Sequence, residues 1–541
     1  RAGDDRASWG YEVDRRSLLK AGAFGAAGLA ASQWVAGCTM PTTPAVFPDP
    51  VDPFWDCGVL SGVHDHTAAV LWTRVAPAAT GGPVDVAWEV ATDPTFGTVV
   101  SRGTGTASAE TDGTVKVLAE GLAPGSTYFY RFTADGRISR TGRTKTPPTP
   151  GNEGGRVRLA VAACQNYPSG YYPAWRGIAD EDVDAVVHLG DYIYESGGYV
   201  PLTDVRRDPV GPATDLATYR AKYRLYRTDP AMLDAHARHA FLPIWDDHEF
   251  QNDYDRVTIL EDPERAAAAY RAWFEYQPVW PVDGTQTYRR VRWGRLVDLT
   301  LLDTRQYRDA HPNGGKLSLS LTTTDPAKEV AATDRTILGE AQRRWLLDGL
   351  GAAQDDGVAW KLVGNQVMIS PIRILDLDEP VLRDADPGLT KHAGIYLNTD
   401  SWDGYQWERD LLTKFLFDEG VQNTAFLTGD IHSFWQSDVV RDFDEDYSPV
   451  VAQEFVCGSV SSRAADFLGA LADGVSVAAQ GLRPGFRYCD LVRRGYGVVE
   501  CTADGSVVQY RHTDALYPVA PMVDGSRFDW ASGGVPSMAP G

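Results

Sequence analysis

Residues 186–195 read Val-Val-His-Leu-Gly-Asp-Tyr-Ile-Tyr-Glu, and this stretch decides how the whole chain is interpreted. A short apolar run ends at Gly190 and is followed at once by Asp191, Tyr194 and Glu195. Such a run is typical of a strand that is buried on both faces. Polar residues directly after it lie at the carboxyl end of the strand, where α/β sheets bind their ligands.

Other apolar runs end in the same way. We expect strands at residues 157–163, 185–189, 241–245, 296–302, 360–364 and 425–427. The polar residues that follow five of them are Cys164-Gln165-Asn166, Asp246-Asp247-His248-Glu249, Asp303-Thr304-Arg305, Asn365-Gln366 and Asp430-Ile431-His432-Ser433. Oxygen, nitrogen and sulfur ligands together indicate a transition metal beside a harder cation.

The chain divides into regions of different pattern. Residues 53–150 contain short alternating β-type runs separated by turns, which predicts an all-β sandwich of the immunoglobulin or fibronectin kind. Residues 156–515 alternate apolar runs with helical stretches at 216–233, 264–276 and 340–350, which predicts an α/β domain that carries these polar endings. We expect a closing hairpin formed by residues 496–500 and 506–511, and residues 516–541 are set apart as a C-terminal extension.

The N-terminus is typical of an export signal. Arg15-Arg16 precedes the apolar stretch 21–37, and together they resemble a Tat signal, so we expect the Tat export machinery as a partner. Val35-Ala36-Gly37-Cys38 resembles a lipobox, so residues 1–38 predict either a lipid anchor at Cys38 or a freely secreted protein. Residues 39–52 are a Pro/Thr-rich linker. The expected location is extracellular, on the cell surface or periplasmic, and no other stretch is predicted to span a membrane.

Net charge and cysteine content limit the partners. The formal net charge of -22 disfavours binding to nucleic acid and to anionic lipid. An anionic substrate would then need bound cations at the site. Of the six cysteines, Cys38 is a lipidation candidate and Cys164 a metal-ligand candidate. The other four allow three disulfide pairings, among which the sequence does not choose.

These motifs resemble the PhoD-type alkaline phosphatase family of the calcineurin-like metallophosphoesterase superfamily. The matching segments include the strand endings above, Trp402-Asp403-Gly404-Tyr405, and in the N-terminal region Gly58-Val59-Leu60-Ser61-Gly62 and Leu71-Trp72-Thr73-Arg74. The resemblance covers nearly everything after residue 53, with the motifs in the family's order. It implies a metallophosphoesterase core in which two sheets are flanked by helices, an αββα arrangement, preceded by the all-β domain.

The resemblance also implies a binuclear metal site. The positions that match the family's ferric iron ligands are Cys164, Asp191, Tyr194 and His432. A second ion, calcium or another divalent cation such as Mn²⁺ or Zn²⁺, would share Asp191 and bind Asp247 and Asp430.

The same resemblance assigns catalytic roles. His248 matches the general acid, and Asp191 is the shared ligand of the site at which a metal-activated hydroxide attacks the phosphate ester. Asn166, Asn365 and Arg305 are candidate substrate contacts. For Asp303 and Arg305, a buried ion pair that braces their loop is the alternative to phosphate binding.

The sequence leaves two rival functions open. Some relatives with these motifs cleave phospholipids, so a phospholipase D or another phosphodiesterase is the alternative to hydrolysis of phosphate monoesters. A non-catalytic surface adhesin on a degenerate enzyme scaffold is the rival from a different class. It predicts missing ligands, whereas this sequence retains nearly the full set.

Overall fold

The computed structural model describes residues 52–539, except 77–80, 198–203, 282–283, 313–329, 331, 377–383, 385–393, 446–447, 464, 466–470 and 484. The predicted signal and Cys38 lie outside the described residues, as does the linker except for its last residue. Within the described part, no helix is long and apolar enough to span a bilayer.

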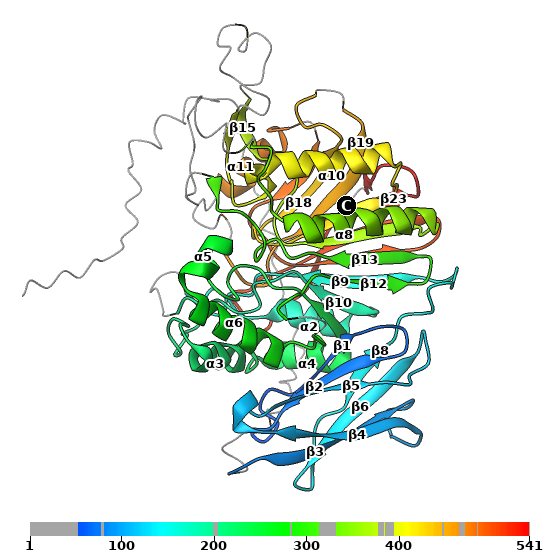
Figure 1. The fold of residues 1–541 in the computed structure, drawn as a ribbon, viewed down its shortest axis with the longest axis vertical. Coiled ribbons are helices and arrows are strands. Elements are labelled where there is room, and N and C mark those ends of the chain that lie inside the picture. The colour runs from blue at the N-terminus through cyan, green and yellow to red at the C-terminus, as the bar shows by residue number, and fades with distance from the viewer. Residues whose placement is uncertain are drawn as a thin grey trace, which may run out of the picture. The chain divides into compact units, whose positions relative to one another are not determined.

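Two large sheets pack face to face (Figure 1). The first has the strand order β24 (Ser537–Met538), β23 (Val523–Ala531), β22 (Gly505–Thr513), β21 (Arg494–Cys501), β9 (Val157–Ala162), β10 (Ala185–His188), β11 (Ala240–Pro243), β1 (Val59–Val63), β2 (Ala69–Arg74), β5 (Thr114–Ala119). The second has the order β12 (Arg289–Trp293), β13 (Val297–Leu301), β14 (Trp360–Asn365), β17 (Thr424–Thr428), β19 (Val450–Cys457), β18 (Phe434–Val440), β20 (Phe486–Asp490).

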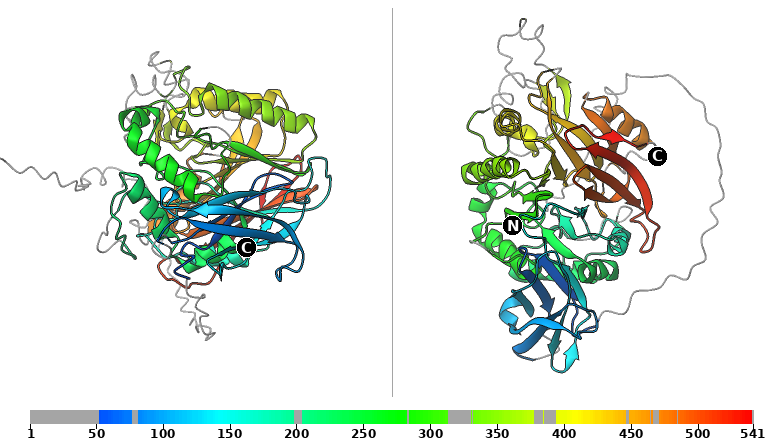
Figure 2. Two further views of the ribbon diagram at one scale, coloured as in Figure 1. Left: turned by 60° about the horizontal axis from the view of Figure 1, so that its bottom comes forward. Right: turned by 90° about the vertical axis from the view of Figure 1, so that its right-hand side faces the viewer.

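Helices cover the outer faces of both sheets (Figures 1 and 2). The first sheet is covered by α2 (Pro173–Asp180), α3 (Leu216–Tyr226), α4 (Pro230–Arg238) and α6 (Pro263–Tyr276), with the short α5 (Arg256–Glu261) beside them. The second is covered by α8 (Gly339–Asp355) and α10 (Gln406–Asp418), while α11 (Ala472–Gln480) packs on β20. This order of layers, helix, sheet, sheet and helix, confirms the predicted fold class.

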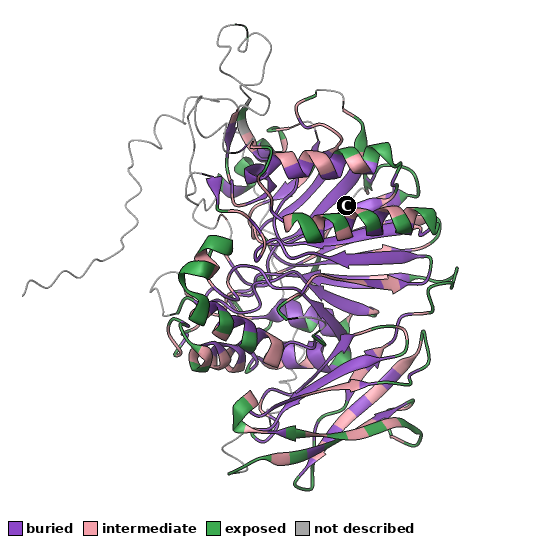
Figure 3. Ribbon diagram, viewed as in Figure 1, coloured by how far each residue is buried: buried purple, intermediate pink, exposed green. Residues whose placement is uncertain are grey.

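The strands are apolar on both faces because each separates two cores. In β10, Val187 packs into the core between the sheets, together with Leu159 and Leu299. Its neighbour Val186 faces the opposite way, into the core formed with the helices. Burial coloured on the ribbon shows continuous buried strands inside and exposed residues on the outer sides of the helices (Figure 3).

The expected helix at residues 216–233 is wrong as a single element. The structure has two helices, α3 and α4, because Pro230 cannot continue a helix and instead starts a new one. Asp229 caps the second helix by accepting hydrogen bonds from the backbone N–H groups of Ala231 and Met232.

The N-terminal region shares strands with the catalytic region. Five of its strands form a separate sheet: β4 (Val99–Ala107), β3 (Val84–Ala91), β6 (Thr127–Ala134), β7 (Arg137–Ile138) and β8 (Gly142–Lys145). Much later in the chain, β15 (Arg373–Asp376) and β16 (Gly394–Tyr396) form a small two-stranded sheet. However, β1, β2 and β5 extend the ten-stranded sheet, because β1 pairs in parallel with β11. At the other end of that sheet, residues 516–541 contribute β23 and β24 beyond the β21–β22 hairpin.

Disulfides are absent from the part of the chain that the structure describes. Cys57, Cys164, Cys457, Cys489 and Cys501 are all buried free thiols. Stability of this part therefore rests on the packed cores.

Candidate metal centre

The predicted ligands lie in turns at the carboxyl ends of parallel strands. β9, β10 and β11 run parallel in one sheet, and β13, β14 and β17 in the other, so the turns after them meet at one edge of the sandwich. Four of these ligands, Cys164, Asp191, Asp430 and His432, have positive φ angles of 57°, 57°, 63° and 58°. Non-glycine residues rarely adopt this conformation, and it is concentrated at functional sites.

One group of ligands contains sulfur, nitrogen and oxygen donors. Ligand atoms of Cys164, Asp191 and His432 lie within 4.8 Å of one another. The Tyr194 hydroxyl donates to Asp191 Oδ2 at 2.6 Å and lies 3.1 Å from His432 Nε2. His432 Nδ1 lies 2.7 Å from the Arg463 carbonyl oxygen, a contact that orients the ring with Nε2 toward Asp191. The structure therefore brings together the four residues predicted for iron.

A second group contains carboxylates. Asp191, Asp247 and His248 have potential ligand atoms within 4.8 Å of one another, as do Asp246, Asp247 and Asp430. Asp191 thus belongs both to this region and to the sulfur-containing group. The side chains of Asp191 and Asp247 are 2% and 4% exposed and that of Asp430 is 17% exposed, so the cluster opens toward solvent on the side of Asp430.

The charge of the cluster suits cations. Burial and the neighbouring Asp246, offset in part by Arg305, hold the pKa of Asp430 well above its ordinary value. Burial, Asp191 and Asp430 likewise raise the pKa of the Cys164 thiol. These groups lie too close together to ionise easily unless positive charge is bound among them. The donor set therefore fits two metal ions, one with sulfur, phenolate and imidazole ligands and one with carboxylates.

Glu195 contacts the predicted general acid, and sequence reasoning assigned it no role. His248 Nδ1 lies 2.6 Å from Glu195 Oε2, and Glu195 Oε1 accepts the Asn252 backbone N–H. Burial lowers the pKa of His248, but Glu195, Asp247 and Asp191 outweigh it and hold that pKa well above its ordinary value. This shift favours the protonated imidazole, the form that a general acid needs. The available signal was the position of Glu195 in the same motif as Asp191.

Glu249 was also missed. Its buried carboxylate accepts the backbone N–H groups of Asp191 at 3.0 Å, Tyr192 at 2.7 Å and Asp246 at 2.8 Å. It therefore joins the turn after β10 to the turn after β11. Its place directly after His248 was the only hint in the sequence.

Arg305 lies inside the acidic cluster. The guanidinium is fully buried and binds Asp246, Asp400 and Asp430. Asp303, two residues earlier, accepts hydrogen bonds from Trp245 Nε1 and the Thr287 hydroxyl, so it braces its own loop.

The two predicted asparagine contacts differ in exposure. Asn166 is half-buried beside Cys164, and its Oδ1 accepts the Ser169 backbone N–H. Asn365 is fully buried, donating to the Val367 carbonyl and accepting from Trp402 Nε1. Their contact with substrate stays a prediction.

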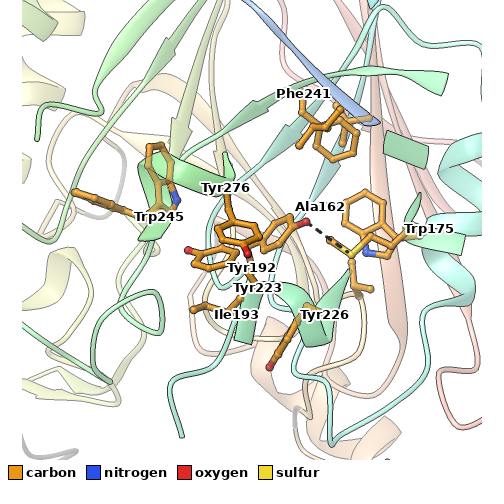
Figure 4. Close-up of a cluster of buried hydrophobic side chains, with 14 of the residues drawn as sticks. Ala162, Trp175, Tyr192, Ile193, Tyr223, Tyr226, Phe241, Trp245 and Tyr276 are labelled. Atoms are coloured by element: carbon orange, nitrogen blue, oxygen red, sulfur yellow. Dashed lines mark hydrogen bonds between the residues drawn. The ribbon is translucent and has the colours of Figure 1, made fainter. Parts of the chain in front are cut away.

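An aromatic cluster supports the Asp191 turn from behind. Tyr192 and Ile193 belong to a buried group that includes Tyr223, Tyr276 and Trp175 (Figure 4). Tyr192 accepts a hydrogen bond from Arg227 Nε at 2.9 Å. The same cluster includes the predicted ligand Tyr194, so the turn after β10 is anchored in this core.

Comparisons with known proteins agree with this architecture. Residues 159–510 match the PhoD-like phosphatase family, and residues 43–148 match its N-terminal domain. Alkaline phosphatase D of Bacillus subtilis (strain 168) is 35% identical over 427 residues, which cover 75% of this chain and 69% of that protein. A solved structure of PhoD superposes with a TM-score of 0.80 at 30% identity, covering 91% of this chain and 94% of that one.

Proposed function

Since this chain belongs to the PhoD-like phosphatase family and is a phosphoric ester hydrolase, we propose that it hydrolyses phosphate monoesters or diesters at a binuclear metal centre. The observation that carries the proposal is the place of Asp191. Its carboxylate is shared between the group with Cys164 and His432 and the group with Asp247. One carboxylate between two donor sets is what a bridged pair of metal ions needs.

We assign ferric iron to the first donor set and calcium to the second. Thiolate, phenolate and imidazole suit a highly charged transition metal, whereas carboxylate oxygens suit calcium. Cys164, Asp191, Tyr194 and His432 would hold the iron, and Asp191, Asp247 and Asp430 the divalent ion. When bound, the two ions would neutralise charge on the phosphoryl oxygens and activate water for in-line attack.

The protein's own groups handle the leaving group. His248 lies beside Asp191 and Asp247, and its side chain is 15% exposed. Glu195 binds Nδ1 of the His248 ring, so Nε2 of that ring is the nitrogen that can donate a proton to the departing alkoxide. Tyr194 packs against the same ring, with centroids 4.0 Å apart, and limits its rotation.

Export by the Tat pathway is part of the proposal. Arg15-Arg16 before an apolar stretch supports it. Cell fractionation of the full chain and of a variant with both arginines changed to lysine tests it. We expect the unchanged chain outside the cytoplasm and the variant retained inside.

Elemental analysis with a substrate panel tests the catalytic proposal. Purified active protein should contain iron and one divalent cation. It should be coloured by charge transfer from the Tyr194 phenolate, and Tyr194→Phe should lose that absorption. The panel compares a monoester, a diester and a choline phospholipid, which separates phosphatase from phospholipase D activity. Active protein without iron or colour would contradict the ligand assignment.

Substitution of Asp191 tests the shared ligand. Asp191→Asn should abolish turnover and reduce the content of both metals, because both donor sets lose a charged ligand. Asp182→Asn is the matched control, since Asp182 is 80% exposed and remote from the ligands. Near-normal turnover of Asp191→Asn would rule out the shared ligand.

A further inference from the structure

Arg305 connects three separate loops at the carboxylate side of the metal centre. Its Nε binds Asp246, which follows β11. Its Nη1 binds Asp400 at 2.8 Å, and its Nη2 binds Asp430, which follows β17, at 3.0 Å. Each of the three nitrogens therefore holds a different carboxylate, and the side chain is fully buried.

Two of the carboxylates around Arg305 are predicted metal ligands. Potential ligand atoms of Asp246, Asp247 and Asp430 lie within 4.8 Å of one another. Arg305 Nη2 lies 3.0 Å from Asp430 Oδ1 and 3.8 Å from Asp247 Oδ2. The guanidinium thus lies next to the predicted ligands of the second ion, and none of the four predicted iron ligands belongs to this group of three carboxylates.

The guanidinium is itself held in place. Asp400 accepts from Arg308 Nη2 at 2.6 Å and contacts His311 Nε2 at 2.5 Å. The Asp303 carboxylate accepts the backbone N–H of Arg305 at 3.0 Å. Because Asp400 and Asp303 hold Arg305 in place, the guanidinium is a fixed hydrogen-bond partner for Asp430.

The single positive charge of Arg305 does not neutralise the carboxylates around it. Asp246, Asp400 and Asp430 face Arg305 directly, and Asp247 lies just beyond hydrogen-bond distance. Arg308 shares only Asp400 with it. The arginine can therefore orient the carboxylates and still leave negative charge for a divalent cation.

We propose that Arg305 is a positioning residue of the second metal site, whose guanidinium fixes Asp430 against Asp246 and Asp400 in the orientation that binds the divalent ion. This inference rests on the proposed two-metal function. It differs from the substrate contact that the sequence suggested for Arg305. Lysine keeps the charge but offers a single nitrogen, so it cannot hold three carboxylates in one fork.

Calcium binding to Arg305→Lys tests the proposal. The unchanged protein, Arg305→Lys and Arg409→Lys are purified with their metals, and iron is measured by elemental analysis and visible absorption. The divalent ion is then removed with a mild chelator and calcium is titrated by calorimetry. Arg409 is the control, because it is equally buried but pairs with Asp403 and touches none of the predicted ligands.

We expect Arg305→Lys to keep its iron and to bind calcium roughly 10–100-fold more weakly, the usual cost of losing a group that orients a metal ligand. Arg409→Lys should bind calcium like the unchanged protein. Unchanged calcium affinity in Arg305→Lys, or equal loss of iron and calcium, overturns the positioning role.

If Arg305→Lys does not fold, Asp400→Asn loosens the same arginine and should also weaken calcium binding. Wild-type calcium affinity in Asp400→Asn overturns the proposal. An unchanged protein that binds no divalent ion would instead refute the two-metal function.

Discussion

Four predicted ligands hold a left-handed backbone conformation that non-glycine residues rarely adopt. The left-handed φ of Cys164, Asp191, Asp430 and His432 costs about 1–3 kcal/mol each. Their side chains converge only because the backbone takes this conformation at the strand ends. The strain lies at the predicted ligands, and hydrogen bonds such as those accepted by Glu249 offset part of it.

His248 and Glu195 should matter most for poor leaving groups. We expect His248→Ala to slow hydrolysis of an alkyl phosphate by on the order of 10²–10⁴-fold and to slow that of a nitrophenyl phosphate much less. The reason is that nitrophenolate leaves without a proton. Glu195→Gln should show the same pattern with a smaller loss.

Steady-state kinetics with both esters, beside metal analysis, check this prediction. The metal content of both variants should equal that of the unchanged protein. If His248→Ala loses metal, the residue is a ligand and the general acid lies elsewhere.

His311 should make stability depend on pH. Burial and Arg308 lower its pKa, but hydrogen bonds with Asp255 and Asp400 outweigh them and raise that pKa above its ordinary value. The protonated form is therefore favoured by folding. Its contribution is fully present below about pH 6.5, the unfolded value, and is lost as the pH rises through the higher folded pKa.

Thermal unfolding of the unchanged protein and of His311→Gln across that range checks the sign. The difference in melting temperature between the two should be largest at low pH and should shrink as the pH rises. A difference that is constant with pH would show that folding does not shift the pKa of His311.

The ligand-bearing turns after β10 and β11 lie in close contact with each other. Gly190, two residues after the end of β10, has a φ of 101°, and a Cβ there would lie 2.4 Å from Asp246 Cβ and 2.6 Å from Asp246 N. Since β10 and β11 are parallel neighbours, their turns lie side by side. This glycine lets the two ligand-bearing turns touch.

Gly190→Ala should destabilise the fold by about 3 kcal/mol, the sum of a left-handed alanine and an overpacked contact. Gly136→Ala is the matched control, because its φ is 70° but nothing lies within 4 Å of the added carbon. It should cost only about 1 kcal/mol. Denaturant unfolding measures both, and equal losses would show that the Asp246 contact is irrelevant.

The N-terminal and catalytic regions share one sheet. β1 pairs with β11 through Ser61–Ala240 and Gly62–Phe241, so residues 59–63 cover what would otherwise be a free strand edge. Trp72 Nε1 donates to the Glu275 carbonyl oxygen of α6 at 2.8 Å. Arg74 and Arg224 both bind Asp112, which adds charged contacts between the two regions.

Residues 156–541 produced alone should therefore fail to fold as a soluble monomer. Removal of β1, β2 and β5 exposes the edge of β11 and part of the core around Trp72. Residues 52–541 are the control and should unfold in one cooperative transition. Size-exclusion chromatography and calorimetry check both chains, and a soluble, cooperatively folded 156–541 would show that the shared sheet is dispensable.

Local patterns in the sequence were enough to predict the strands, the polar endings and the types of ligand. Each of these depends on a few consecutive residues: an apolar run, a turn and the side chains after it. Asp191 and Tyr194 lie in one motif, and the family resemblance assigned both of them as ligands. The alternation of such runs with helical stretches predicted an α/β region, whereas the arrangement of two sheets between helices was implied by the family resemblance.

Tertiary structure alone decided which groups meet. Arg305 binds carboxylates that lie 59, 95 and 125 residues away along the chain, and His248 reaches Glu195 across 53 residues. The parallel pairing of β1 with β11 joins residues 61 and 240. Such contacts depend on how sheets and loops pack in three dimensions, and no local spacing encodes that packing. The sequence by itself therefore determined the chemistry available to the site, and folding determined its geometry.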